Sequence, residues 1–246
     1  YQRNILIMKV LLSKDSKYVI EDNVKEINTK DGIIKIENKE VVESHLGKKF
    51  AVCEPNLLDI LSKLKRGPQA ILPKDAMFLL AYTGIKQNSK ILEAGTGNAF
   101  LSIQLAWYLK PCKIYSFEKD ERFYPIAKEN VKKAGLEEYI EIIKDDIFNY
   151  EKYIKNEKFD LIFLDFEKSN EFIKHAFNLL KNGAYLAIFC PTADSLMKNV
   201  EEVKKYNFLI TIVENIVREW QVEYYFRPKT LGIMHTGFLI IARKIF

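Results

Sequence analysis

The N-terminal part of the chain consists of short apolar runs separated by polar turns. The turns contain Asp-Asn, Lys-Asp-Gly and Leu-Gly sequences, which interrupt extended segments and reverse the chain. We expect the apolar runs between them to be strands, at residues 8–13, 18–20, 32–37 and 50–53. This pattern predicts a small antiparallel β domain over residues 1–53.

From residue 90 onward the chain alternates short apolar runs with longer amphipathic stretches. Such alternation is typical of α/β proteins, in which helices cover both faces of a parallel sheet. The runs predict strands at residues 90–93, 113–118, 140–144, 159–165 and 184–189. The stretches predict helices at residues 99–109, 121–134, 170–180 and 192–206. Two last runs, 208–217 and 237–243, have no helical stretch between them, which favours a closing antiparallel pair.

Two further amphipathic segments lie between these regions. Residues 55–65 and residues 75–82 both have the apolar periodicity of a helix. We therefore expect a helical linker over residues 54–89, followed by an α/β domain over residues 90–246.

Composition narrows the class of protein without fixing its partner. Hydrophobic residues make up 48% of the 246 residues and charged residues 29%, which is ordinary for a globular chain with a sizeable core. The net charge of +5 permits a polyanionic partner such as RNA but does not demand one.

The cysteines and histidines indicate neither a disulfide framework nor a metal site. Cys53, Cys112 and Cys190 lie far apart, and the three histidines have no metal-ligand spacing. This usage suits a reducing cytoplasm. The apolar start at residues 5–12 is interrupted by Lys9 and is shorter than the roughly 18 residues that a membrane span needs, so we expect no membrane segment.

A glycine-containing turn joins the strand predicted at residues 90–93 to the next helix. The turn runs from Glu93 to Ala99 and contains Gly95, Thr96 and Gly97. Glycines let the backbone approach a ligand closely, and the helix that follows presents free N–H groups. A dinucleotide site would have a third glycine at a fixed spacing. The acidic residue before the glycines, Glu93, would repel a pyrophosphate, and it suits the cationic methionine end of S-adenosylmethionine.

Carboxylates also follow the next three predicted strands. Glu118 lies at the end of the second strand, where it can accept hydrogen bonds from both ribose hydroxyls. Asp146 follows the third strand and Asp165 ends the fourth. Because ligands of open α/β sheets bind outside the carboxyl ends of the strands, we expect these three residues and Glu93 to face one crevice. The ordered set predicts a methyltransferase that uses S-adenosylmethionine.

With these motifs in place, the chain resembles the tRNA (adenine-58-N1) methyltransferases of archaea and bacteria over nearly its whole length. The resemblance rests on residues 55–66, 69–75, 92–97, 218–220, 227–228 and 235–239. It implies a seven-stranded Rossmann-like class I methyltransferase sheet with a small N-terminal β domain. It further implies tRNA as the partner, an adenine at position 58, or possibly 57, as the target, and a homotetramer built as a dimer of dimers.

The resemblance also implies roles for individual residues. Asp165 would be the catalytic residue, holding the amino group of the target adenine. The cofactor would contact Glu93, Gly95, Thr96, Gly97, Ala99, Glu118, Asp146 and Asp165. The substrate side would contain Lys65, Arg66, Gln69, Leu72, Arg227 and His235, with Lys63 and Lys229 as further phosphate contacts. Since N1 methylation needs no base, His235 is expected to be a hydrogen-bonding residue.

The chain departs from the family pattern at three places. Leu72 replaces a tyrosine that would stack on the target base, and base–aromatic stacking is worth roughly 1–3 kcal/mol. The segment after Asp165 reads Phe-Glu-Lys-Ser-Asn in place of Leu-Pro-x-Pro-Trp. The third glycine of the cofactor turn is missing, and Ala99 is its nearest substitute.

Two other functions therefore remain open. Residues 159–170 also resemble the Asp-x-Asp-Lys-x-Asn stretch of metal-dependent small-molecule O-methyltransferases, although the segment after the fifth strand lacks the Asp-Asn pair that such a metal site needs. Alternatively, the departures at Leu72 and after Asp165 suit a non-catalytic tRNA-binding paralogue. The intact turn from Glu93 to Gly97 argues against that paralogue, because a binding subunit has no need of a cofactor pocket.

Overall fold

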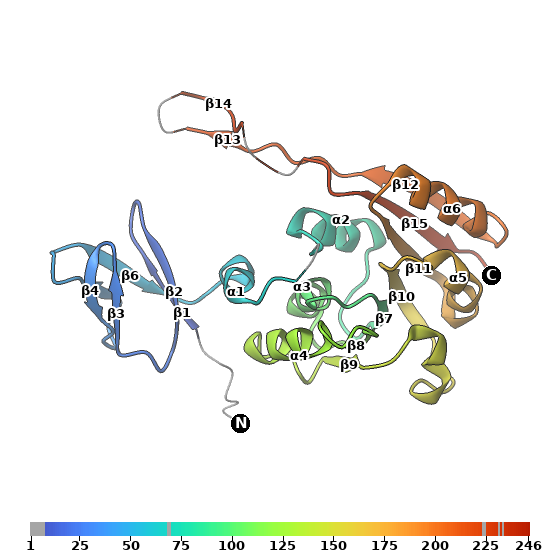
Figure 1. The fold of residues 1–246 in the computed structure, drawn as a ribbon, viewed down its shortest axis with the longest axis horizontal. Helices are drawn as coiled ribbons and strands as arrows, with labels where there is room; N and C mark the ends of the chain where they lie inside the picture. The colour runs from blue at the N-terminus through green and yellow to red at the C-terminus, as the bar shows by residue number, and fades with distance from the viewer. Residues whose placement is uncertain (1–7, 68–69, 223–224, 231, 233) are drawn as a thin grey trace. The chain divides into compact units, whose positions relative to one another are not determined.

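Figure 1 shows the fold in a computed structural model, which describes residues 8–67, 70–222, 225–230, 232 and 234–246. The chain divides into two compact units. The first contains residues 1–65 together with 130–135, and the second contains residues 66–129 together with 136–246.

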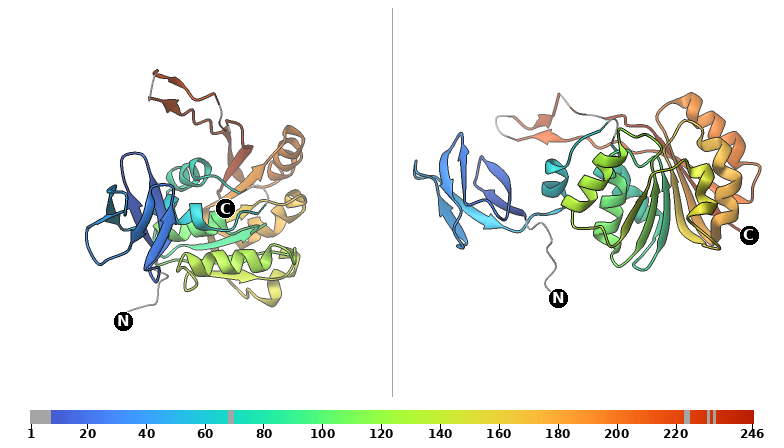
Figure 2. Two further views of the ribbon diagram at one scale, coloured as in Figure 1. Left: turned by 60° about the vertical axis from the view of Figure 1, so that its left-hand side comes forward. Right: turned by 60° about the horizontal axis from the view of Figure 1, so that its bottom comes forward.

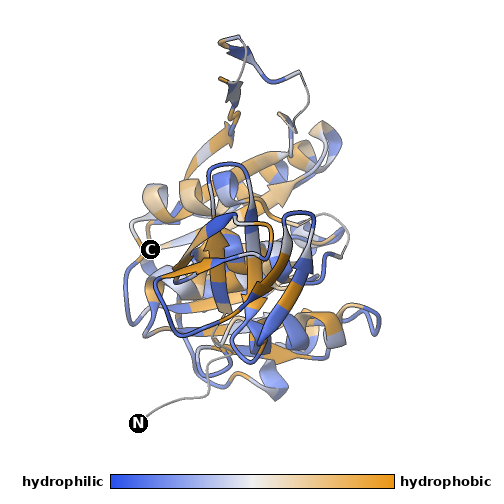
Figure 3. Cartoon of the chain, turned by 90° about the vertical axis from the view of Figure 1, so that its left-hand side faces the viewer, coloured by the Kyte–Doolittle hydropathy of each residue, from blue (hydrophilic) through white to orange (hydrophobic). Residues whose placement is uncertain are grey.

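The first unit contains a small antiparallel sheet with strand order β2-β1-β6-β5 and a separate hairpin, β3–β4. The bounds of these strands are β1 Met8–Leu12, β2 Lys17–Glu21, β3 Glu26–Thr29, β4 Gly32–Lys35, β5 Val41–Glu43 and β6 Lys49–Cys53. Leu11, Ile34 and Phe50 form the centre of its core and are fully buried. Orange apolar stretches on the strands and blue polar turns follow the alternation on which the prediction of a small β domain rested (Figure 3). That prediction is confirmed.

Helix α1, Leu57–Lys63, completes the first unit as a short helix with a full capping box. The Asn56 side chain accepts the Asp59 amide at 3.0 Å, and the Asp59 carboxylate accepts the Asn56 amide at 3.0 Å. Lys17 on β2 donates to the same carboxylate at 2.7 Å, which fixes the helix against its own sheet. The helix ends before Leu64, two residues earlier than predicted.

The second unit is built on a seven-stranded sheet with strand order β12-β15-β11-β10-β7-β8-β9. The strands are β7 Lys90–Ala94, β8 Lys113–Phe117, β9 Ile140–Ile143, β10 Phe159–Leu164, β11 Leu180–Cys190, β12 Phe208–Glu214 and β15 Phe238–Lys244. Strands β7 to β11 run parallel, whereas β15 is antiparallel to both β11 and β12. The predicted α/β class, with a closing antiparallel pair, is confirmed.

Helices cover both faces of this sheet, with α2 and α3 on one face and α5 and α6 on the other (Figure 2). The helices of the unit are α2 Pro73–Thr83, α3 Phe100–Leu109, α4 Tyr124–Lys133, η1 Ile147–Lys152, α5 Ser169–Leu179 and α6 Ala193–Val203. Because the sheet is covered on both faces, its central strands are apolar at nearly every position: Leu161, Ile162, Phe163 and Leu164 all lie in the interior.

Several elements were not predicted. The strands β3 and β5 are short and largely exposed, so they lack the apolar alternation of a buried strand. Strand β11 begins at Leu180 instead of residue 184 because its ladder with β10 contains an irregularity that accommodates Gly183, whose φ is 79°. Among the described residues, no helix is both long enough and apolar enough to span a membrane.

A two-stranded ribbon lies between β12 and β15, where no structure was predicted. Strand β13, Trp220–Gln221, pairs antiparallel with β14, Arg227–Pro228. We refer to the segment between Asn215 and Thr236, in so far as it is described, as the C-terminal arm. It projects from the ends of β12 and β15 and carries exposed apolar side chains (Figure 1).

Candidate active site

The turn between β7 and α3 has the conformation that its glycines predict. Gly95, Gly97 and Ala99 all have positive φ angles, of 88°, 55° and 63°. The backbone of Gly95 packs directly against the backbone of Asp165, where no side chain would fit. Ala99 takes the left-handed conformation at the start of α3 although this costs a non-glycine residue roughly 1–2 kcal/mol.

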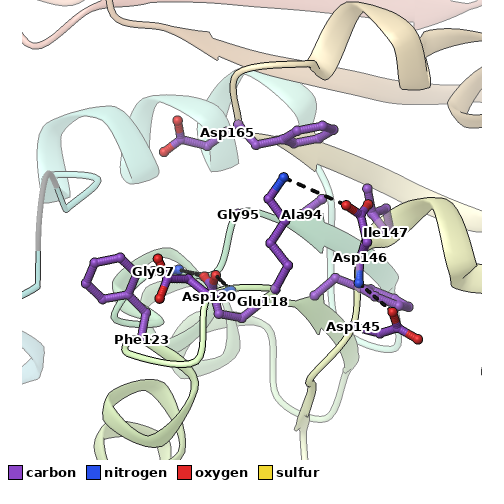
Figure 4. A pocket seen from close by; sticks show the side chains of 13 residues that line it. Ala94, Gly95, Gly97, Glu118, Asp120, Phe123, Asp145, Asp146, Ile147 and Asp165 are labelled. Atoms are coloured by element: carbon purple, nitrogen blue, oxygen red, sulfur yellow. Dashed lines mark hydrogen bonds and ion pairs between the residues drawn. The ribbon is translucent and has the colours of Figure 1, made fainter.

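Glu118 joins this turn to the segment that follows β8. Its carboxylate accepts the Gly97 amide at 2.7 Å and the Asp120 amide at 2.8 Å (Figure 4). Burial raises the pKa of the Glu118 carboxyl, and the two amide bonds partly oppose that rise. The side chain is thus held in place at the edge of the turn, in the position predicted for a ribose contact.

A cavity of about 310 Å³ opens at the carboxyl ends of β7, β8, β9 and β10 (Figure 4). Its lining contains five of the eight residues predicted to bind the cofactor: Gly95, Gly97, Glu118, Asp146 and Asp165. The structure therefore brings together residues that lie up to 70 positions apart in the sequence.

The other three predicted cofactor residues, Glu93, Thr96 and Ala99, belong to the same turn but are buried and do not line the cavity. The Glu93 carboxylate accepts hydrogen bonds from the hydroxyls of Ser102 and Ser116. The Thr96 hydroxyl shares a 2.6 Å hydrogen bond with Ser116. Of the four carboxylates expected to face one crevice, Glu93 is thus the exception, and it supports the turn from within.

Burial also governs the charge of Glu93. Desolvation raises the pKa of its carboxyl to about 7, against the lowering effect of the Ser102 and Ser116 hydroxyls. The negative charges of Asp165 and Glu118 add to the rise. Any cation bound in the cavity would favour the ionised forms of all three carboxyls.

Asp165 lies on the opposite wall of the cavity from Glu118 (Figure 4). Its backbone amide donates to the carbonyl of Ala94, the last residue of β7, at 2.9 Å, which continues the ladder between the two strands one residue past the end of β10. Burial raises the pKa of its carboxyl to about 7. A carboxyl in a cleft whose pKa lies near neutral pH is typical of functional sites.

Asp146 begins the short helix η1, and its side chain accepts the Phe148 amide at 3.1 Å. Lys119 lies 3.7 Å from the same carboxylate, across the cavity rim. The neighbouring Asp145 accepts hydrogen bonds from Asn149 at 2.7 Å and from Tyr153 at 3.0 Å. This segment therefore forms a rigid wall at the end of β9.

Eight of the 13 described residues that line the cavity were not among the predicted site residues. Three of the eight, Asp120, Phe123 and Phe166, lie two to six positions beyond the end of a strand, which is the signal that could have found them. Phe166 is backed by the edge-on ring of Phe148, at a centroid distance of 6.5 Å, and Phe148 in turn packs on Phe172. The lining of the cavity thus combines aromatic rings with carboxylates.

The predicted substrate-side residues are more scattered. Lys65, Arg66 and Arg227 are exposed, and Leu72 is half-buried at the start of α2, whereas Gln69 lies outside the described residues. The ring of His235 forms a 2.5 Å contact with the Glu214 carboxylate, which agrees with the hydrogen-bonding role expected for it. None of the described residues in this set lines the cavity.

The open, mainly parallel sheet, the glycine turn after β7 and the acidic cavity at its carboxyl edge define the class of S-adenosylmethionine-dependent methyltransferases. The cavity fits that cofactor, because it is lined by the glycine turn and by carboxylates, Glu118, Asp146 and Asp165 among them, which could accept hydrogen bonds from hydroxyls and balance a positive charge. A family model described as the GCD14 subunit of the tRNA methyltransferase complex matches residues 54–234. The chain belongs to this family.

A comparison with an individual relative supports this family assignment. Over 266 aligned residues, covering 96% of this chain and 94% of the relative, the sequence is 29% identical to the tRNA (adenine(57)-N(1)/adenine(58)-N(1))-methyltransferase TrmI of Methanocaldococcus jannaschii. Two solved structures have the same fold. A SAM-dependent O-methyltransferase from Thermotoga maritima aligns over 99% of this chain and 95% of its own, with a TM-score of 0.83 and 25% identity. The tRNA (m1A58) methyltransferase TrmI from Aquifex aeolicus aligns over the full length of both chains, with a TM-score of 0.80 and 24% identity.

Proposed function

We propose that this protein transfers a methyl group from S-adenosylmethionine to the N1 nitrogen of an adenine in the T loop of tRNA, at position 58 or the adjacent position 57. The observation that carries the proposal is Asp165, a carboxyl with a pKa raised to about 7 in the cofactor cavity of a chain from this family. The relative from Methanocaldococcus jannaschii has both positions in its name.

The cofactor would be held by the residues around the glycine turn. Glu118 would accept its ribose hydroxyls, Asp146 would lie at its adenine, and the backbone of Gly95 and Gly97 would lie along its methionine end. Glu93, Thr96 and Ala99 would act from beneath, by fixing the turn. When bound, the cofactor supplies a methyl group activated on a sulfonium sulfur, and the bond to sulfur breaks as the nitrogen lone pair bonds the carbon.

Asp165 would orient the target base. Adenine N1 carries a lone pair and no proton, so its methylation needs positioning and exclusion of water more than a general base. The ionised Asp165 carboxylate would accept a hydrogen bond from the amino group of the adenine and would lie near the positive charge that develops on the ring. The low polarity that raises its pKa also strengthens both interactions.

The RNA would reach the site by extrusion of the base and by contacts to its backbone. Exposed cations at Lys65, Arg66 and Arg227 are the proposed phosphate contacts, together with Lys63 and Lys229. Lys229 is 2.5 Å from Glu219, so part of its charge is already balanced within the protein. Gln69 and Leu72 are proposed to flank the extruded base.

We propose a homotetramer, as a dimer of dimers, and a cytoplasmic location as part of the same function. The C-terminal arm supports the assembly, because Trp220, Tyr225 and Phe226 are 58%, 73% and 82% exposed and would be covered by a second copy. The free thiols of all three cysteines support the location.

The decisive experiment is methyl transfer from tritiated S-adenosylmethionine to unmodified tRNA transcripts. We expect the wild-type protein to label a transcript with adenine at position 58, and Asp165→Ala to lose at least about 100-fold in rate, as loss of a positioned charged contact does. Glu201→Gln, on the exposed face of α6, is the matched control. A wild-type protein that labels no tRNA would overturn the proposal, and transcripts with guanine at position 57 or 58 identify the target.

A small-molecule O-methyltransferase is the second candidate, because the solved structure with a TM-score of 0.83 is described as an O-methyltransferase. Transfer to a catechol that depends on added Mg²⁺, with no transfer to tRNA, would establish it. Calorimetric titration with S-adenosylmethionine separates both enzymes from a non-catalytic paralogue, since failure to bind would establish the latter.

A further inference from the structure

The ammonium group of Lys74, in the first turn of α2, is enclosed by three acceptors. It donates to Asp75 Oδ1 at 2.9 Å, to the carbonyl oxygen of Asn215 at 2.5 Å and to Thr236 Oγ1 at 2.7 Å. The Lys74 side chain is only 10% exposed. Because a lysine has three N–H donors, this ammonium is saturated and has none left for a ligand.

The partners of Lys74 also bond to one another and to its backbone. The Thr236 hydroxyl donates to Asp75 Oδ2 at 2.8 Å, and the Asn215 side chain donates to the carbonyl oxygen of Lys74 at 2.6 Å. Asp75 is 3% exposed, so its charge depends on these bonds. The four residues form a closed polar cluster that joins positions 141 to 162 residues apart in the sequence.

This cluster lies at both ends of the C-terminal arm. Asn215 directly follows β12, and Thr236 lies two positions before the start of β15. Phe238 pairs with Glu214 on one side and with Cys190 on the other, which places the base of the arm at the carboxyl edge of the sheet. That edge also carries Asp165. The strands β10 and β15 are separated by one strand, so the base of the arm is about 10 Å from the Asp165 segment along the sheet.

The elements joined by the cluster also have other contacts. In helix α2, Ala76 and Leu79 are buried, and β12 and β15 pair along their whole length, from Phe208 opposite Lys244 to Glu214 opposite Phe238. The cluster in addition links the base of the arm to the first turn of α2, the helix that begins after Leu72.

We infer that Lys74 is a positioning residue for the acceptor: it fastens both ends of the C-terminal arm to the first turn of α2, and so holds the arm beside the edge at which the base must enter. The inference rests on the proposed function for the identity of the acceptor as RNA. Lys74 does not line the cavity, and it would act through Asn215 and Thr236.

Two variants test this role. Thr236→Val removes one hydroxyl and keeps the Lys74–Asp75 ion pair, and Lys74→Met together with Asp75→Leu removes both buried charges at once, which avoids leaving either unpaired. We expect the KM for tRNA to rise roughly tenfold in the double variant, as a small misplacement of binding groups does, with the dissociation constant of S-adenosylmethionine unchanged. Lys86→Met, an exposed lysine after the same helix, is the control.

A second measurement needs no tRNA. Trypsin can cut the arm after Arg218 and Lys229, and release of the arm should speed this cleavage in both variants but not in Lys86→Met. Cleavage and KM that are both unchanged in the two variants would overturn the inference. A parallel loss of cofactor affinity and melting temperature would also overturn it, because it would indicate a merely structural role. If the wild-type protein methylates no tRNA, the proposed function is wrong. Faster cleavage of both variants at unchanged cofactor affinity would then still support the role of Lys74 in holding the arm against α2.

Discussion

The carbonyl oxygen of Asp165 lies 1.9 Å from the position that a Cβ on Gly95 would occupy. The backbone between β10 and α5 therefore rests on a glycine of the turn between β7 and α3, with no space for any side chain. Two walls of the cofactor cavity are in this way fixed against each other by their backbones.

Replacing Gly95 by alanine should consequently destabilise the fold. We expect Gly95→Ala to lower the free energy of unfolding by about 3 kcal/mol, because the turn must shift and its positive φ is strained. Gly97→Ala is the matched control, since its Cβ would meet nothing within 4 Å and only its φ of +55° is unfavourable, at about 1 kcal/mol. Urea unfolding of both variants measures the difference, and equal losses would refute the role of the close contact.

The raised pKa of Asp165 predicts a pH-dependent gain in stability from Asp165→Asn. A folded-state pKa of about 7, above the ordinary 3.8, means that the folded protein holds the proton longer, so this carboxyl lowers stability progressively between those two pH values. The full shift corresponds to about 4 kcal/mol, and since the Asp165 side chain is partly exposed we expect the variant to be about 1–2 kcal/mol more stable than wild type near pH 8.

Thermal melts across the pH range check this prediction. The two proteins should melt alike near pH 4 and diverge up to about pH 7, with a constant difference above it. An Asp165→Asn variant that is less stable than wild type near pH 8 would show that the carboxylate has a favourable partner in the folded state.

Glu118→Gln should weaken cofactor binding. The variant side chain can accept only one of the two amide bonds that the carboxylate now accepts, from Gly97 and Asp120, and it loses the charge that would bind ribose hydroxyls. We expect the dissociation constant of S-adenosylmethionine to rise roughly 10- to 100-fold in calorimetric titration. Glu121→Gln, whose exposed carboxylate pairs with Lys144, should bind as wild type does. Equal affinities of wild type and Glu118→Gln would remove Glu118 from the cofactor site.

The exposed apolar side chains of the C-terminal arm predict a change in assembly. We expect Phe226→Glu to shift the molar mass in sedimentation equilibrium toward that of the monomer, because a charge at a buried interface position costs about 2 kcal/mol or more per contact. Met197→Glu, at a side chain that is 62% exposed on α6, should leave the mass unchanged. The arm would have no part in assembly if both variants had the mass of the wild type.

The sequence was sufficient to predict the elements that repeat a strong local signal. The turn from Glu93 to Ala99 and the carboxylates Glu118, Asp146 and Asp165 could be placed because each follows an apolar run at the same edge of a parallel sheet. The direction of a side chain was not predictable in the same way. Leu92, Glu93 and Ala94 are all buried because both faces of β7 are covered, so no alternation reveals that Glu93 points away from the cavity.

Features that depend on distant partners were beyond prediction from local patterns. Strands β13 and β14 contain two residues each and have no apolar alternation. Phe166 becomes part of the cavity wall only because Phe148 supports it from η1. The cluster of Lys74 with Thr236 joins residues 162 positions apart, and nothing in the sequence near either one indicates the other.

The place of β15 in the sheet has a consequence for synthesis. This strand lies between β11 and β12, yet it leaves the ribosome after both of them. Until Phe238–Lys244 has emerged, the edge of β11 is uncovered and β12 has no strand to pair with. A nascent chain thus displays the unpaired edge of an apolar strand, the kind of surface that invites aggregation and that chaperones recognise. The carboxyl edge on which the cofactor turn lies can form early, whereas the base of the arm is completed last.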